Sequence, residues 1–190
     1  MMNDDSITLF IRSENISREN SYAFTIKIIF SLFPLSKYSL IIDHHYLSWF
    51  SINSARKMSE ELNAKYLLYK KTFFRCSGTP INSFSMELKS SDDLKQFLKI
   101  FGKDTDDIYL RILSKTQDIT PFFNKSIKEG EEIYKELLNT NVEYQAILFL
   151  SCIPLDIIVI SDKIDFTNSI DMVKDTATIM NIELDEINLF

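Results

Sequence analysis

The sequence predicts an α+β fold, in which a mostly antiparallel mixed sheet packs against four or five helices within a single domain, residues 1–190. Three observations support this prediction. Strand-like and helix-like segments alternate without a regular βαβ order, and short turns join two pairs of strand-like segments. In addition, 45% of the residues are hydrophobic, which is enough to form a sizeable core.

The N-terminal part begins with a β-branched run from Ile7 to Arg12, which predicts a strand. Ser17 can cap a following helix, and Pro34 ends it. The apolar stripe of this helix, at helical spacing, comprises Tyr22, Ile26, Ile29, Phe30 and Phe33. We expect a second short strand from Ser39 to Asp43. The helical stretch expected after it contains Met58 and Leu62.

The middle of the chain holds two strand-like runs, Tyr66 to Phe74 and Phe84 to Leu88, separated by turn residues at 76–80. They predict an antiparallel pair. A helix should follow, because Ser90 or Ser91 can cap it and two aspartates favour its positive end. Its apolar stripe comprises Leu94, Phe97, Leu98 and Phe101, and it should end at Gly102.

The last part alternates strands and helices. Ile108 to Leu113 predicts a strand with Tyr109 and Arg111 on one face, and a capping box predicts a helix from Ser126 to Leu138. Two apolar strands should lie centrally in the sheet, over 142–152 and 155–160. The final elements are a helix that opens at Thr167, with its apolar stripe at Ile170, Val173, Ala177 and Met180, and an edge strand over 182–190.

The cysteines and the N-terminus indicate the compartment. Cys76 and Cys152 have no paired spacing, which predicts free thiols in a reducing environment. The N-terminus is acidic where a secretory signal would be basic. The most apolar early stretch, Tyr22 to Phe33, is too short to span a bilayer. We therefore expect a cytoplasmic protein that does not bind a membrane.

The uneven distribution of charge is the most informative feature. The net charge is −6, yet residues 1–141 contain 19 basic and 18 acidic residues, whereas residues 142–190 contain 2 and 9. An acidic surface attracts a basic partner and speeds its association. The residues expected to bind such a partner are Asp162, Asp165, Asp171, Asp175, Glu183, Asp185 and Glu186. The alternative is a solvated face that maintains solubility.

A basic stretch with interleaved aromatic residues lies between Arg56 and Arg75. Such a mixture can hold phosphates and stack bases. The alternative is that its aromatic residues belong to the core and its lysines to the solvated side of a strand. Because the whole chain is acidic, we expect no nucleic-acid partner.

Asp43, His44 and His45 follow the apolar run Leu40-Ile41-Ile42 and could ligate a metal ion. The tripeptide resembles the Asp-His-His signature of a phosphoesterase family that uses divalent metals, and this resemblance implies a metal-dependent hydrolase. It covers three residues and the preceding strand. The family's further metal-binding aspartates and glycine-rich segments are not recognisable here. Neighbouring residues of a strand also face opposite ways, so the alternative is a surface turn.

A Cys-His nucleophile pair is a further candidate, because such partners meet only in the fold. Cys152 lies in an apolar strand, where a thiol behaves as a small hydrophobe, so Cys76, in a turn, is the better candidate. Trp49 and Phe50 could line a pocket beside the histidines, or belong to the core.

These observations favour a non-enzymatic protein-binding domain. More specifically, they favour an immunity-type inhibitor that neutralises a cognate toxin through its acidic C-terminal face. We predict no catalytic residue, no metal and no cofactor. Two alternatives remain open: a metal-dependent hydrolase centred on Asp43, His44 and His45, and a structural or adaptor subunit that acts by oligomerisation.

Overall fold

Antiparallel strands and three helices make up the part of the chain that the computed structural model describes, residues 6–47, 70–73, 80–101, 108–119, 143–152 and 154–190. The strands are β1 (Ile7–Ser13), β2 (Tyr38–Leu47), β3 (Lys70–Phe73), β4 (Pro80–Leu88), β5 (Ile108–Ser114), β6 (Tyr144–Cys152), β7 (Leu155–Ser161) and β8 (Glu186–Leu189). The helices are α1 (Arg18–Leu32), α3 (Ser91–Phe101) and α6 (Ser169–Ile179). The predicted α+β class is confirmed.

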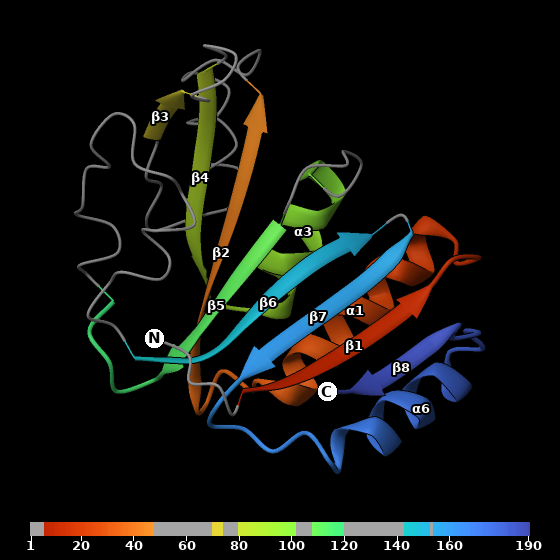
Figure 1. Cartoon of the computed structure of the whole chain (residues 1–190). Coiled ribbons are helices and arrows are strands. Elements are labelled where there is room, and N and C mark those ends of the chain that lie inside the picture. Colours follow the sequence, from red (N-terminus) through yellow and green to blue (C-terminus); the bar gives the residue numbers. More distant parts are fainter. Residues whose placement is uncertain (1–5, 48–69, 74–79, 102–107, 120–142, 153) are drawn as a thin grey trace.

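The strands form one sheet in the order β3-β4-β2-β5-β6-β7-β1-β8, and every neighbouring pair is antiparallel. The sheet twists strongly, so that β4 and β2 are steeply inclined to β7 and β1 (Figure 1). The N-terminal strand β1 lies between β7 and β8, which joins the two ends of the described chain in one edge of the sheet.

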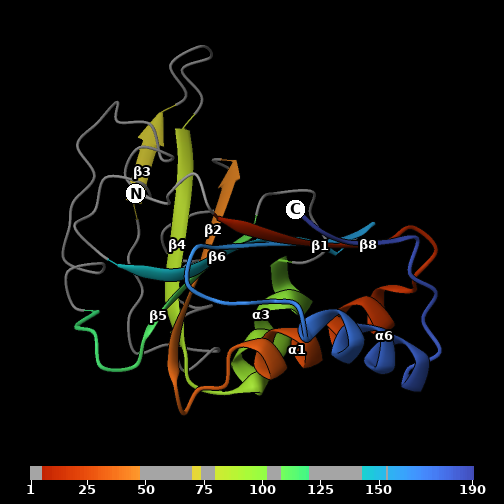
Figure 2. The ribbon, with the colours of Figure 1, turned by 60° about the horizontal axis from the view of Figure 1, so that its bottom comes forward.

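The three described helices lie on the same face of the sheet, and α1 lies between α3 and α6 (Figure 2). The core fills the space between these layers. Fully buried side chains there include Phe24 and Phe33 from the helical layer and Leu9, Ile11 and Leu40 from the strands. Burying a side chain of this size contributes about 2 kcal/mol.

The number of helices differs from the prediction. We expected four or five, and the structure contains three within the residues it describes. The helices expected around Met58 and Leu62 and from Ser126 to Leu138 lie outside those residues. The prediction of four or five helices is therefore not confirmed.

Local capping signals placed two helix starts correctly. The hydroxyl of Ser17 accepts a hydrogen bond from the backbone N–H of Asn20 at 3.3 Å, at the start of α1. At α3 the Ser90 hydroxyl accepts from the Asp93 N–H at 3.2 Å, and the Asp93 carboxylate accepts from the Ser90 N–H at 2.9 Å. This reciprocal pair is a capping box.

The buried side of α1 is wider than the predicted stripe. Ser21, Phe24, Thr25 and Ile28 are buried although the stripe omitted them, whereas Ile26 and Phe30 are only half-buried. Because α1 packs against the sheet and against helices on both sides, more than one stripe of the helix is removed from water.

The second strand is also longer than predicted. We expected a strand over residues 39–43, followed by a turn at the histidines, but β2 continues to Leu47. Its backbone pairs with β4 on one side and β5 on the other, and this ladder includes Asp43, His44 and His45. The β5 ladder extends to His44 and the β4 ladder continues to Leu47, and this pairing keeps the chain extended.

Candidate functional site

The loop that leads into α6 is fixed by a buried serine and by an aspartate. The Ser161 hydroxyl, at the end of β7, donates to the Gln145 carbonyl at 2.6 Å and accepts from the backbone N–H groups of Lys163 and Ile164, each at 3.0 Å. The Asp165 carboxylate accepts from the N–H and the hydroxyl of Thr167, at 2.8 and 2.6 Å. These hydrogen bonds lower the pKa of Asp165.

Helix α6 has a buried side and an acidic exposed side. Val173, Thr176 and Ala177 are buried against the core. Asp171 and Asp175 are exposed, and their spacing of four residues places them one turn apart on the same side of the helix. Helix α6 thus carries two carboxylates directed to solvent.

The chain leaves α6 through a left-handed residue. Asn181 has a φ of 54°, which asparagine tolerates better than most residues. The backbone N–H of Asn181 donates to the Thr178 carbonyl at 3.1 Å, and that of Ile182 donates to the Ala177 carbonyl at 2.9 Å. This pair of bonds is a Schellman motif, and it turns the chain back toward β8.

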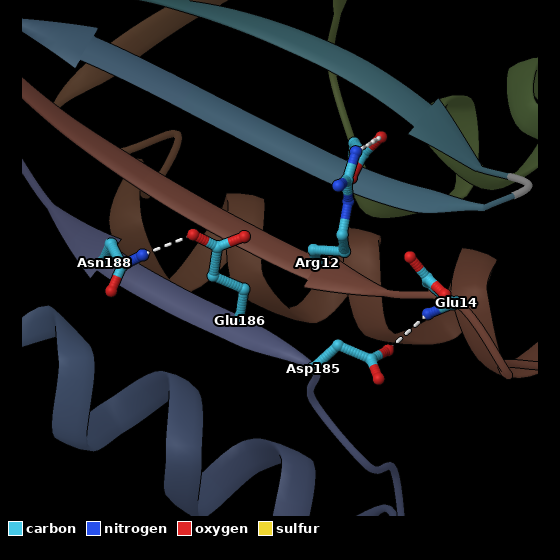
Figure 3. Close-up of polar contacts among 6 residues, drawn as sticks. Arg12, Glu14, Asp185, Glu186 and Asn188 are labelled. Carbon is cyan, nitrogen blue, oxygen red and sulfur yellow. Dashed lines mark hydrogen bonds and ion pairs between the residues drawn. The ribbon is translucent and has the colours of Figure 1, made fainter.

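The segment before β8 is tied to the end of β1 (Figure 3). The Ser13 hydroxyl donates to the Glu183 carbonyl at 2.7 Å, and the Asp185 N–H donates to the Arg12 carbonyl at 3.0 Å. The Asp185 carboxylate accepts from the Glu14 N–H at 2.6 Å. The Asp185 carboxylate is therefore already bonded to the backbone of Glu14.

Glu186 lies on the other face of the sheet from α6. It pairs in register with Arg12, which alternates along β1 with Leu9 and Ile11, the residues that face the core beneath the helices. Glu186 accepts a hydrogen bond from the Asn188 amide (Figure 3). Arg12 binds Asp156 through two nitrogens, at 2.8 and 3.3 Å. The hydrogen bond to Asp156 and the charge of that carboxylate raise the pKa of Arg12, and the charge of Glu186 adds to this effect.

The seven carboxylates predicted to bind a partner thus fall into two groups. Three of them accept internal hydrogen bonds, and we call Asp165, Asp185 and Glu186 the bonded carboxylates. The other four make no hydrogen bond or ion pair among the residues that the structure describes. We call these the unpaired carboxylates: Asp162, Asp171, Asp175 and Glu183.

The unpaired carboxylates follow α6 along the chain. Asp162 precedes the helix, Asp171 and Asp175 lie on it, and Glu183 follows it. Residues 154–190 contain eight acidic residues against two lysines. One of these lysines, Lys163, is paired with Glu143. The structure therefore keeps four of the predicted acids near α6 and places Glu186 on the opposite face of the sheet.

Sequence reasoning missed a pair of buried charged residues on the face of the sheet opposite α1, α3 and α6. Glu87 on β4 is 7% exposed and Arg111 on β5 is 8% exposed. Both lie beside Ile41 of β2 in register, and Lys89 pairs with Glu87. We predicted only that Arg111 lies on the second face of its strand. The near-continuous apolar run around Arg111 indicated burial on both faces.

The other chemical candidates gain no support from geometry. Cys152 is 4% exposed, and burial raises its pKa to about 11. Such a thiol is inert near neutral pH. The side chains of Asp43, His44 and His45 lie outside what the structure describes, as do Trp49, Phe50, Cys76 and the basic stretch from Arg56 to Arg75. Within its described part, the structure has no group of three or more His, Cys, Asp or Glu residues placed to hold a metal ion.

Comparison of the chain with protein-family models, with curated proteins and with solved structures gave no match. Among the helices described here, none is both long and apolar enough to cross a membrane.

Proposed function

We propose that this protein is a non-enzymatic protein-binding domain, an inhibitor of the immunity type that captures a toxin with a basic surface through the unpaired carboxylates around α6. The observation that carries the proposal is the division of the acids. Asp165, Asp185 and Glu186 have hydrogen-bond partners within the chain, whereas the unpaired carboxylates have none among the described residues. Carboxylates without internal partners can bind lysine or arginine from another protein without first losing a contact.

The electrostatics support the same proposal. The unpaired carboxylates and Asp165 lie on or beside α6 together with Lys163 and Lys174, and Lys163 is paired with Glu143, so the local charge is negative. Such a charge steers a basic protein to the surface and raises the rate of association. A toxin that acts on nucleic acid needs a basic cleft, and an acidic surface can occupy that cleft in place of phosphates.

An apolar contact lies beside the acids. Ile179 is 75% exposed and lies one turn after Asp175 on α6. Binding surfaces commonly combine an apolar anchor with a charged rim. The exposed side of α6 therefore offers both parts of a protein interface.

The test compares two variants that lose similar charge. The unpaired variant carries Asp162→Asn, Asp171→Asn, Asp175→Asn and Glu183→Gln, and the bonded variant carries Asp165→Asn, Asp185→Asn and Glu186→Gln. Each protein is immobilised and incubated with an extract of the native host, and captured proteins are identified by mass spectrometry. We expect the wild type and the bonded variant to retain a basic protein that the unpaired variant loses.

Equal recovery of that protein by all three forms would contradict the proposal. Recovery of no basic protein by the wild type would contradict it as well. Once the partner is purified, its toxicity on expression alone, and the loss of that toxicity on co-expression with this chain, test the inhibitor role directly.

A further inference from the structure

The edge of the sheet at β8 presents backbone groups for pairing. Among the described strands, β8 pairs only with β1. Thr8 and Phe190 exchange both backbone hydrogen bonds, at 2.9 and 3.0 Å. In an antiparallel pair such mutual bonds recur at every second residue. Asn188 and Glu186 therefore bond toward β1, and the N–H and C=O groups of Ile187 and Leu189 point away from it.

An outward row of backbone groups of this kind is a template for a further strand. An added strand would place alternate side chains above and below the sheet. On one face these side chains would lie beside Glu186 and Asn188, which already bond each other, and on the other face they would lie toward α6.

Charge indicates which strand fits this edge. A second copy of this chain would bring two acidic segments together, because residues 154–190 carry eight acids and two lysines. Like charges in neighbouring strands destabilise their pairing, whereas opposite charges favour it. An extended segment with lysine or arginine at alternate positions is therefore the occupant that the edge favours.

Exposed apolar side chains lie at both ends of the edge. Phe190 is 72% exposed and directly follows β8, and Ile179 is 75% exposed at the end of α6. Helix α6 runs alongside β8 in the opposite direction, so its end lies near the start of the strand (Figures 1 and 2). An added segment would find an apolar contact at each end.

We propose that the toxin presents an extended basic segment that adds to β8 as a further strand. This inference rests on the proposed function, and it specifies the element of this chain that is used and the conformation of the partner. The backbone of Ile187 and Leu189 supplies the pairing, and the unpaired carboxylates around α6 select a basic segment.

The probe is a short synthetic peptide of alternating lysine and valine, labelled with a fluorophore and studied with the full chain. We expect it to bind by fluorescence anisotropy and to protect the Ile187 and Leu189 amides from hydrogen exchange. The Asn188 amide, which is directed toward β1, should change little. A peptide with methyl groups on alternate backbone nitrogens should bind about tenfold more weakly, because it loses pairing bonds.

Two substitutions test the edge from the protein's side. Leu189→Pro removes an outward N–H and leaves the bonds between β1 and β8 in place, and Leu189→Ala is its matched control because it keeps that N–H. We expect the proline variant to bind the peptide about tenfold more weakly than the alanine variant. Thermal unfolding of both variants checks that they remain folded.

No binding of the peptide, binding without protection of Ile187 and Leu189, or equal binding of the methylated peptide would overturn this inference. Its failure is distinguishable from failure of the proposed function. If the host partner is lost by the unpaired variant but retained by Leu189→Pro, the acidic surface acts without strand addition. If both variants retain the partner, neither proposal holds.

Discussion

The strands β4 and β5 use charge in the opposite way to helix α6 and its flanking segments. At β4 and β5, Glu87 and Arg111 are buried, and Lys89 pairs with Glu87. Around α6, the exposed carboxylates Asp171 and Asp175 have no partner among the described residues. A buried charge that loses its interactions destabilises the fold, whereas an exposed one contributes little to it. Removing charge on β4 or β5 should therefore reduce stability, and removing it around α6 should reduce binding.

The largest loss of stability should follow from replacing Arg111. Arg111→Met removes a buried guanidinium and leaves the groups that surround it without its charge, so we expect the free energy of unfolding to fall by about 3 kcal/mol. Arg12→Met is the matched control, because the Arg12 side chain is 39% exposed in its pair with Asp156. Urea unfolding measures the free energy of unfolding of both variants. An Arg12 variant that loses as much stability as the Arg111 variant would remove the distinction between buried and exposed charge.

A smaller effect is expected at Glu87. Glu87→Gln removes the charge that pairs with Lys89, and the free energy of unfolding should fall by about 1 to 2 kcal/mol. The loss is smaller because the Lys89 side chain is 50% exposed and regains water. The double variant with Lys89→Met completes a thermodynamic cycle. A coupling energy of zero would show that the pair contributes nothing.

The unpaired carboxylates should matter least for stability at neutral pH. Asp171→Asn together with Asp175→Asn should change the free energy of unfolding by no more than about 0.5 kcal/mol. The same double variant should bind the toxin more weakly. A large loss of stability would mean that these carboxylates have a structural role and would weaken the case for an interface.

The smallest expected effect is the contribution of Asp165 to the pH dependence of stability. Its pKa in the folded chain is lowered by the hydrogen bonds from Thr167, so its stabilising contribution is present above the ordinary pKa of an aspartate. That contribution is lost as the pH falls through the lowered pKa. Asp165→Asn should therefore lower the unfolding midpoint at pH 7, and the difference from the wild type should shrink on acidification. A difference that is constant with pH would contradict this assignment.

Local signals predicted much of the fold. Ser17 and Ser90 cap helices as expected, because capping depends on residues a few positions apart. The hairpin of β3 and β4 was predicted for the same reason. The continuation of β2 through His44 and His45 was not predicted, because it depends on pairing with strands distant in sequence.

The candidate site was predictable only in part. The concentration of acids near the C-terminus is visible in the sequence, but their division into two groups is not. It depends on contacts such as that of Asp185 with the Glu14 backbone, which join residues 171 positions apart. The burial of Glu87 and Arg111 likewise depends on how neighbouring strands pack around Ile41.

The central claim is that the unpaired carboxylates attract a basic toxin. The most direct test is the association rate of the purified toxin at increasing ionic strength, measured for the wild type and for the unpaired and bonded variants. We predict that the rate falls steeply with salt for the wild type and the bonded variant. The unpaired variant should associate about tenfold more slowly at low salt and respond little to salt. The same rate and the same salt dependence in all three proteins would contradict the account.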